Sequence, residues 1–176
     1  MAYNDYVDTN LLAGKLGNAA LVAGVPVIEV VQSFVVGASD YATSAPRYRI
    51  FKAIPSDAII LSIKILNEAV AGVTAGTIGL SNVLDFDGVG ATVDAACLSA
   101  GFNFSSANTI ASVAAEALTA VTIANREKQL WELAAQTQAP GAAGPKASAY
   151  DICLYMTSMT TNTAAIMVRM SYIRGV

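Results

Sequence analysis

The chain has 176 residues, a formal net charge of −3 and no histidine. Its length suits one domain with a substantial core and does not require two. The slightly acidic balance argues against a general nucleic-acid binder, which normally carries a strong excess of basic residues. Without histidine, a Ser-His-Asp triad is impossible, and the commonest general base and zinc ligand are missing as well. We therefore expect no enzyme, no cofactor, no metal and no nucleic-acid partner.

Charged side chains are sparse for the surface that such a chain must expose. Ten Lys and Arg and 13 Asp and Glu make 23 charges, while 55% of the residues are hydrophobic. A monomer of this size should expose on the order of 8,000 Å², or roughly 350 Å² per charge. Because large apolar patches usually mark interaction surfaces, we expect other subunits to cover much of this surface. The alternative is that the plentiful Ser, Thr, Asn and Gln solubilise the outside.

Targeting and membrane signals do not fit the sequence. The residues before Lys15 are acidic, whereas a secretory signal needs a basic start followed by an apolar core. No run of about 18 strongly apolar residues occurs, so we expect no membrane partner. Cys97 and Cys153 have no CxxC spacing. We interpret them as buried small hydrophobes in a reduced compartment, although a single disulfide between them is also compatible with the sequence.

The first 36 residues divide into an arm and a strand. Residues 1–25 are rich in Gly, Ala, Asn and Leu with no firm period, and we interpret them as an extended N-terminal arm that lies on a neighbour. A frayed terminus is the alternative. Residues 26–176 form the single domain in this interpretation. Its first strand is predicted at 26–36, which is rich in β-branched residues and opens with Pro26.

Residues 47–67 are predicted to form a strand, a tight turn and a second strand. The turn is Pro55-Ser56-Asp57, where proline presets φ and the next two side chains can hydrogen-bond the backbone. The second run alternates with period two, which is typical of a strand with one buried face. The predicted core positions of that face are Ile59, Leu61, Ile63 and Ile65.

The middle of the chain continues the β pattern. Residues 76–83 alternate around Gly79, and a glycine inside a strand indicates a close backbone approach or a bulge. Asp85 and Asp87 form a fragment of a calcium loop. Because a third ligand and the closing glutamate are missing at the required offsets, a solvated turn is the favoured interpretation there.

The last third holds weak helical signals and two clear strands. Residues 108–121 space their apolar side chains as a helix does but contain several threonines, so a short helix and an irregular loop both remain open. Residues 127–134 predict one helical turn or a short strand. After a Pro/Gly/Ala loop at 136–147, residues 148–158 and 164–173 alternate and predict a C-terminal hairpin. Alternation places Tyr150, Ile152, Leu154 and Met156 on one face of the first strand, and Ile166, Val168, Met170 and Tyr172 on one face of the second.

Several strands joined by long polar connections, with at most one or two short helices, predict an all-β antiparallel β-sandwich. Arg47, Arg49, Lys52 and Lys64 form a basic group on neighbouring strands, with Arg47 and Arg49 on one strand face. Arg47, Arg49 and Lys52 are the candidate contacts to an acidic neighbour. The alternative is a solvated face whose cations block edge pairing. Trp131 is a further candidate contact, because tryptophan is enriched at interface centres. A core tryptophan that anchors a loop is the favoured alternative.

The order of these segments resembles a known family. Residues 49–65, RIFKAIPSDAIILSIKI, resemble the hairpin with Arg-hydrophobic-Phe, then Pro, then Ala-hydrophobic that is common in small structural proteins of tailed-bacteriophage heads. Residues 76–80, 127–133 and 150–157 are similar to the following segments of that family, and residues 165–173 are similar to its closing strand. The resemblance runs through residues 45–175 and rests mainly on the order of the segments.

The resemblance implies a capsid decoration or cement protein of jelly-roll type. Such a protein is a non-enzymatic part of the virion that bridges major capsid subunits. Its partners would be the major capsid protein and itself, as a homotrimer, with no small-molecule substrate. It would be made in the host cytoplasm and would lie on the capsid surface.

Two alternatives to head decoration stay open. The motifs do not separate head decoration from a head–tail or tail role. A carbohydrate- or receptor-binding fibre domain is the other alternative, because the seven tyrosines could stack on sugars.

Overall fold

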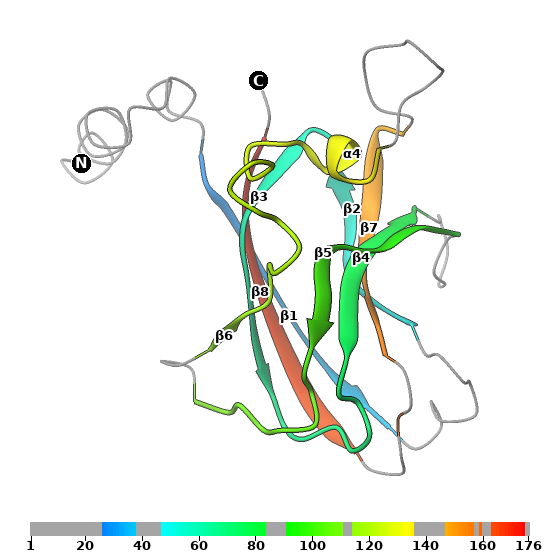
Figure 1. Cartoon of the computed structure of the whole chain (residues 1–176), viewed down its shortest axis with the longest axis vertical. Coiled ribbons are helices and arrows are strands. Elements are labelled where there is room, and N and C mark those ends of the chain that lie inside the picture. Colours follow the sequence, from blue (N-terminus) through cyan, green and yellow to red (C-terminus); the bar gives the residue numbers. More distant parts are fainter. Residues whose placement is uncertain are drawn as a thin grey trace, which may run out of the picture.

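The computed structural model describes residues 26–37, 47–83, 91–110, 114–135, 147–156, 159 and 163–174. The strands of these residues form two antiparallel four-stranded sheets that face each other as two layers (Figure 1). The first sheet has the order β1 (Ile28–Val36), β8 (Ala164–Arg174), β3 (Ala58–Asn67) and β6 (Ala115–Glu116). The second has the order β2 (Arg47–Pro55), β7 (Ala149–Tyr155), β4 (Gly76–Asn82) and β5 (Thr92–Phe102).

The chain crosses between the two layers at almost every connection. Among the described strands, β4 and β5 are the only consecutive pair that lies within one sheet. Strands that are distant in sequence therefore become neighbours, as in the double Greek key of a jelly roll. The predicted jelly-roll-like antiparallel β-sandwich is confirmed. The predicted arm at residues 1–25 lies outside the described residues.

The two predicted hairpins are wrong in their pairing. The strands on either side of Ser56 and Asp57 lie in different sheets, where β2 pairs with β7 and β3 pairs with β8. The turn therefore carries the chain from one layer to the other, and β7 and β8 are separated in the same way. Alternation reports which face of a strand is buried, but it does not report which strand lies beside it.

The predicted core face of β3 is half right. Ile63 and Ile65 are fully buried, whereas Leu61 is 44% exposed and Ile59 is only half-buried. The pairing of β3 with β8 shifts register just after Ile60. Such a bulge inserts a residue and changes the phase of the alternation, so the inward positions before it differ in parity from those after it.

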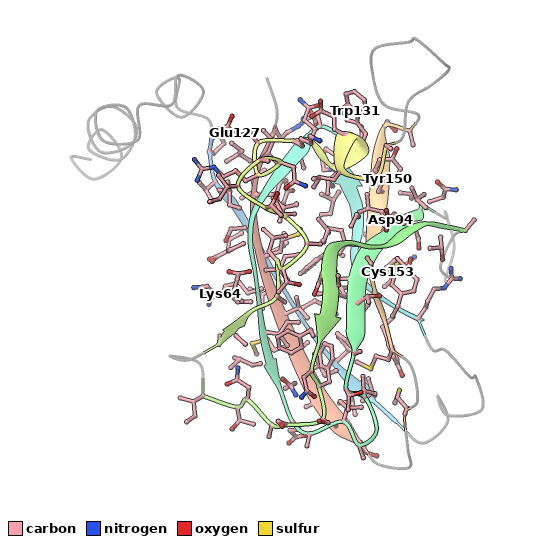
Figure 2. All side chains as sticks on the ribbon, in the orientation of Figure 1. Lys64, Asp94, Glu127, Trp131, Tyr150 and Cys153 are labelled. Carbon is pink, nitrogen blue, oxygen red and sulfur yellow. The ribbon has the colours of Figure 1, made fainter. Side chains whose placement is uncertain are left out.

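The core fills the space between the layers (Figure 2). The side chains that alternation groups on one face of each of the last two strands are all buried, namely Tyr150, Ile152, Leu154, Met156, Ile166, Val168, Met170 and Tyr172. The opposite face of β7 is also closed, because Asp151 and Cys153 are 0% exposed. β7 is thus buried on both faces for most of its length.

The predicted helical segments differ in outcome. Among the described residues of the 108–121 segment there is no helix; Asn108 forms a β-bridge with Asn67, and β6 pairs with β3. The helical turn predicted at 127–134 is confirmed as α4 (Leu130–Leu133). The Gln129 N–H donates to Glu132 Oε2 over 2.8 Å, which forms half of a capping box. α4 lies at one end of the two layers (Figure 1).

The prediction for Gly79 is confirmed. Between the pairs Ile78–Ser99 and Leu80–Asp94, β4 advances two positions while β5 advances five. The extra residues of β5 bulge over Gly79, where a Cβ atom would lie 2.0 Å from the Asp94 carbonyl oxygen. Only a glycine leaves room for this approach.

Candidate functional site

The predicted contact residues fall on two separate parts of the molecule. Arg47, Arg49 and Lys52 lie on β2, an edge strand of the second sheet. Trp131 lies on α4, at one end of the sandwich (Figure 2). The structure thus keeps the three cations together on one strand and places the tryptophan elsewhere.

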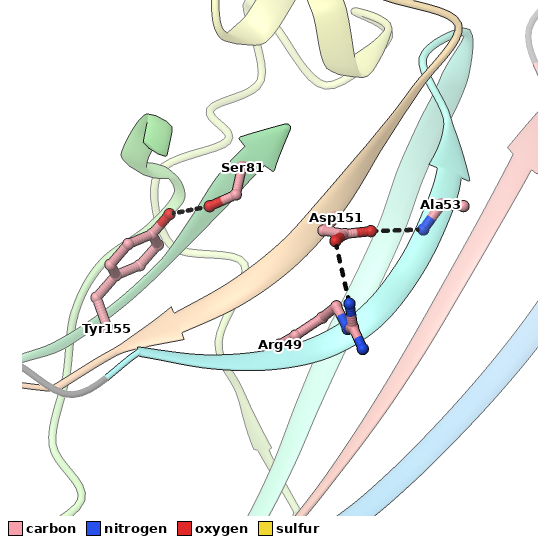
Figure 3. Close-up of polar contacts among 5 residues, drawn as sticks. All are labelled: Arg49, Ala53, Ser81, Asp151 and Tyr155. Carbon is pink, nitrogen blue, oxygen red and sulfur yellow. Dashed lines mark hydrogen bonds and ion pairs between the residues drawn. The ribbon is translucent and has the colours of Figure 1, made fainter. Parts of the chain in front are cut away.

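Arg47 and Lys52 are solvent-exposed, and so is Lys64, which lies on β3 of the other sheet and is therefore separated from the β2 cations. Arg47 donates from Nη1 to Thr92 Oγ1 of β5 over 2.8 Å. On the same sheet, the Tyr155 and Ser81 hydroxyls lie 2.8 Å apart (Figure 3). This region of the second sheet is therefore lined by polar groups, with Arg47 at its border.

Arg49 shares its face of β2 with Arg47, and its side chain points to a buried carboxylate on β7 (Figure 3). Its Nη1 lies 3.8 Å from Asp151 Oδ2, and Asp151 is fully buried. The other carboxylate oxygen accepts a hydrogen bond of 2.8 Å from the Ala53 N–H. Ala53 has a φ of 53° and sits where the β2–β7 register is interrupted, between Phe51 and Ile54.

The Arg49–Asp151 pair stabilises the irregular backbone of β2 at Ala53. An alanine in the left-handed region is strained, and its N–H has left the regular ladder. Asp151 satisfies that N–H, and Arg49 offsets the charge that Asp151 brings into the interior. A role of Arg49 in external contacts stays a prediction, as it does for Arg47, Lys52 and Trp131.

Trp131 connects α4 to the turn between β2 and β3. Its backbone N–H donates to the Ser56 carbonyl over 3.2 Å, and its indole Nε1 donates to Gln129 Oε1 over 2.6 Å. The ring is half-buried against the hydrophobic core. These contacts fit a tryptophan that anchors a loop while leaving part of its ring at the surface.

An exposed apolar face on the first sheet was not predicted from the sequence. The exposed side chains are Val31 (52%), Val35 (61%), Met167 (42%) and Leu61 (44%). β1 supplies the valines, and β8 and β3 supply the other two. The sequence did contain a signal for it. In residues 28–36 both the even and the odd positions carry apolar side chains, whereas a strand with one buried face needs them at only one of the two sets.

Charged side chains form a row across the strands of the same sheet. Arg169 lies 3.7 Å from Glu29, and both side chains are more than half exposed. Lys64 stands opposite Arg169 in the register and opposite Glu116 on the other side. Exposed pairs of this kind contribute little to stability, so they mainly set the charge pattern of the face.

A second unpredicted feature is an apolar side chain on a tight turn. Ile123 is 87% exposed, the largest value among the exposed large hydrophobic residues of the described chain. The turn is closed by a 3.1 Å bond from the Asn125 N–H to the Thr122 carbonyl and by a 3.2 Å bond between their side chains. The fold thus exposes the Ile123 side chain to solvent on a hydrogen-bonded turn.

Both cysteines are free thiols, so the disulfide alternative is wrong. Cys153 is buried as predicted, whereas Cys97 is only half-buried. Burial raises the pKa of Cys97 from its ordinary 9.0 to about 12, and the charge of Asp94 adds to the effect. Burial also raises the pKa of Cys153, which is 0% exposed. Because the thiolate is the nucleophile, both residues should be inert in the folded chain.

We expect the native protein to resist thiol labelling. At pH 8 the raised pKa of Cys97 lowers its thiolate fraction by on the order of a thousandfold. A maleimide should therefore modify the folded chain far more slowly than the chain in urea, where both cysteines should react. The labelling is followed by intact mass, and rapid labelling of the native chain would contradict this account.

The described residues hold no group of three His, Cys, Asp or Glu that could bind a metal ion. Asp85 and Asp87 lie outside the described residues. None of the helices in the described ranges combines the length and hydropathy needed to span a membrane.

Comparisons with known proteins give one similar structure. No protein-family model matches this chain, and no curated protein matches its sequence. Among solved structures, a chain of the cyanophage Pam1 capsid asymmetric unit is similar to it, with a TM-score of 0.46 and 14% sequence identity. The similarity covers 85% of this chain and 84% of that chain.

Proposed function

We propose that this chain is a non-enzymatic structural protein of a phage virion that decorates the capsid and cements neighbouring major capsid subunits as a homotrimer. The observation that carries the proposal is the exposure of apolar side chains on a charge-poor sandwich. The resemblance of residues 45–175 to phage head proteins gives the class of partner. The proposal also places the protein on the capsid surface.

Cementing needs many weak, identical contacts rather than one strong site. Each contact would bury apolar surface at about 25 cal/mol per Å², and a trimer that holds several capsid subunits adds its contacts through multivalency. Ile123 and the exposed edge of Trp131 are suited to apolar contacts. Arg47 and Lys52 on the β2 edge are suited to acidic neighbours, where charges mainly steer association.

The proposal is tested by adding the purified chain to capsids that lack it. Co-sedimentation should saturate at a copy number in the hundreds, and the decorated capsids should resist heat better than bare ones. A copy number of a dozen or fewer would instead indicate a head–tail or tail component. Absence of binding, with a chain that stays monomeric, would contradict the proposal.

We expect the double variant Arg47→Ser/Lys52→Ser to bind such capsids roughly tenfold more weakly at low salt, with a smaller loss at high salt. Both side chains are exposed, so the melting temperature should hardly change. Lys64→Ser/Lys128→Ser removes two exposed cations that lie outside β2 and is the matched control. Equal loss in the control would show that net charge, rather than the β2 edge, controls binding.

The sugar-binding alternative receives little support from the tyrosines. Tyr150 and Tyr172 are buried, Tyr155 is bonded to Ser81, and Tyr48 stacks on Phe34 with 5.5 Å between ring centroids. The remaining three tyrosines lie outside the described residues. A glycan array is the direct test, and specific hits would favour the fibre alternative.

A further inference from the structure

We propose that β1 pairs in antiparallel fashion with β1 of a second copy of this chain, about a twofold axis at Gln32. The two first sheets would then join into one continuous sheet. The contact does not depend on the capsid role, and in a decorating protein it would link neighbouring trimers rather than build one.

β1 presents an uninterrupted strand edge. It lies at the end of the first sheet, and among the described strands only β8 pairs with it. Its register with β8 runs through all nine residues without a shift. The strand reads IEVVQSFVV, with six Ile, Val or Phe residues and no Pro, Lys or Arg.

The other sheet edges carry the devices that prevent such pairing. β2 has two register shifts and the cations Arg47, Arg49 and Lys52. β5 is broken by its bulge over Gly79, and β6 has only two residues. Bulges, basic side chains and short length are the usual protections of an edge. Among the described strands, β1 alone is a long edge that lacks all of them.

The burial of β1 shows that both of its faces are open at the centre. Val31, Gln32 and Ser33 are all exposed, although neighbouring residues of a strand point to opposite faces. On the face toward the core, Val30 and Phe34 are only half-buried. An added strand beside β1 would extend both faces and finish the burial of this side of the core.

The sequence of β1 is compatible with pairing to itself. With Gln32 opposite Gln32 of the second copy, Val30 meets Phe34 and Val31 meets Ser33, each on the same face. Glu29, the only charge of the strand, meets Val35. The two Glu29 side chains then lie about 20 Å apart, so no like charges oppose each other. This self-complementarity favours a second copy over an unrelated strand.

The test uses a cysteine at the proposed axis. In the full chain carrying Gln32→Cys, the two new thiols would be directly opposite, with Cα atoms about 4.5–5.5 Å apart, which suits a disulfide. Mild oxidation should give a covalent dimer on a non-reducing gel. The native cysteines should not contribute, because Cys153 is buried, Cys97 is half-buried and the pKa values of both are raised. Ser33→Cys is the matched control, since its two thiol-bearing residues would lie about 8 Å apart and should cross-link poorly.

A second variant tests the contact without a covalent bond. Gln32→Lys places two cations opposite each other and should raise the dissociation constant of the twofold contact at least tenfold, seen by light scattering and sedimentation. Gln32 is exposed, so the variant should fold, which circular dichroism checks. Cross-linking of Gln32→Cys no better than Ser33→Cys, or an unchanged mass for Gln32→Lys, would overturn the proposal. Both results would also follow if residues 1–25 of the same chain covered β1.

Discussion

Replacing Gly79 with alanine should destabilise the fold by about 3 kcal/mol or prevent folding altogether. The added Cβ would lie 2.0 Å from the Asp94 carbonyl oxygen and 2.4 Å from the Ala95 carbonyl carbon. Both are backbone atoms, so no side chain can rotate away to make room. The bulge of β5 would have to lift from β4, which would break the pairing around Leu80.

The loss is measured by urea unfolding with the fluorescence of the single tryptophan, Trp131. Gly37→Ala is the matched control, because a Cβ there would meet nothing within 4 Å; we expect a change below about 0.5 kcal/mol. Equal stability of the two variants would show that β5 does not lie as close to Gly79 as described. A smaller m-value for the Gly79 variant would show that its native state exposes more surface.

Gly79 also illustrates what a single sequence can predict about this fold. A glycine inside an alternating run implies a close approach, and the alternation of the last two strands placed their buried faces correctly. These are local signals, read from neighbouring residues. The bulge after Ile60 leaves no such signal in the sequence. Leu61 continues the alternation of apolar residues, and only the pairing of β3 with β8 shows that the register shifts there. Strand pairing itself depends on contacts between distant segments, so both predicted hairpins were wrong.

The same limit applies to the candidate site. The sequence placed Arg47 and Arg49 on one face of a strand, which the register confirms, since they lie opposite Tyr155 and Cys153 of β7. It could not show that Arg49 faces Asp151, which lies 98 positions beyond Ala53, the residue that Asp151 binds. The open edge of β1 is equally hidden, since a strand becomes an edge only through the order of the whole sheet. Sequence patterns therefore identified the cations but could not show that Arg49 pairs with a buried carboxylate while Arg47 and Lys52 are exposed.

If Arg49 stabilises Asp151 and Arg47 does not, the Arg49→Met variant should lose about 3 kcal/mol of the free energy of unfolding. The variant would leave the fully buried Asp151 without the guanidinium that lies 3.8 Å from its Oδ2. Asp151→Asn should cost less, about 1–2 kcal/mol, because the amide oxygen can still accept the Ala53 N–H. Urea unfolding at pH 7 measures each change.

The double variant Arg49→Met/Asp151→Asn separates a structural pair from two independent residues. If the charges offset each other, the double variant should be more stable than the sum of the single losses implies, by at least about 1 kcal/mol. Strictly additive losses would show that Arg49 does not stabilise Asp151, and Arg49 would then rejoin Arg47 and Lys52 as a contact candidate. Capsid binding adds an independent readout. At a temperature where the Arg49→Met variant is still folded, this variant should bind capsids as the wild type does. The Arg47→Ser variant should bind capsids more weakly while keeping wild-type stability. The opposite pattern would mean that Arg47 is structural and Arg49 makes the contact, which the burial of Asp151 beside Arg49 argues against.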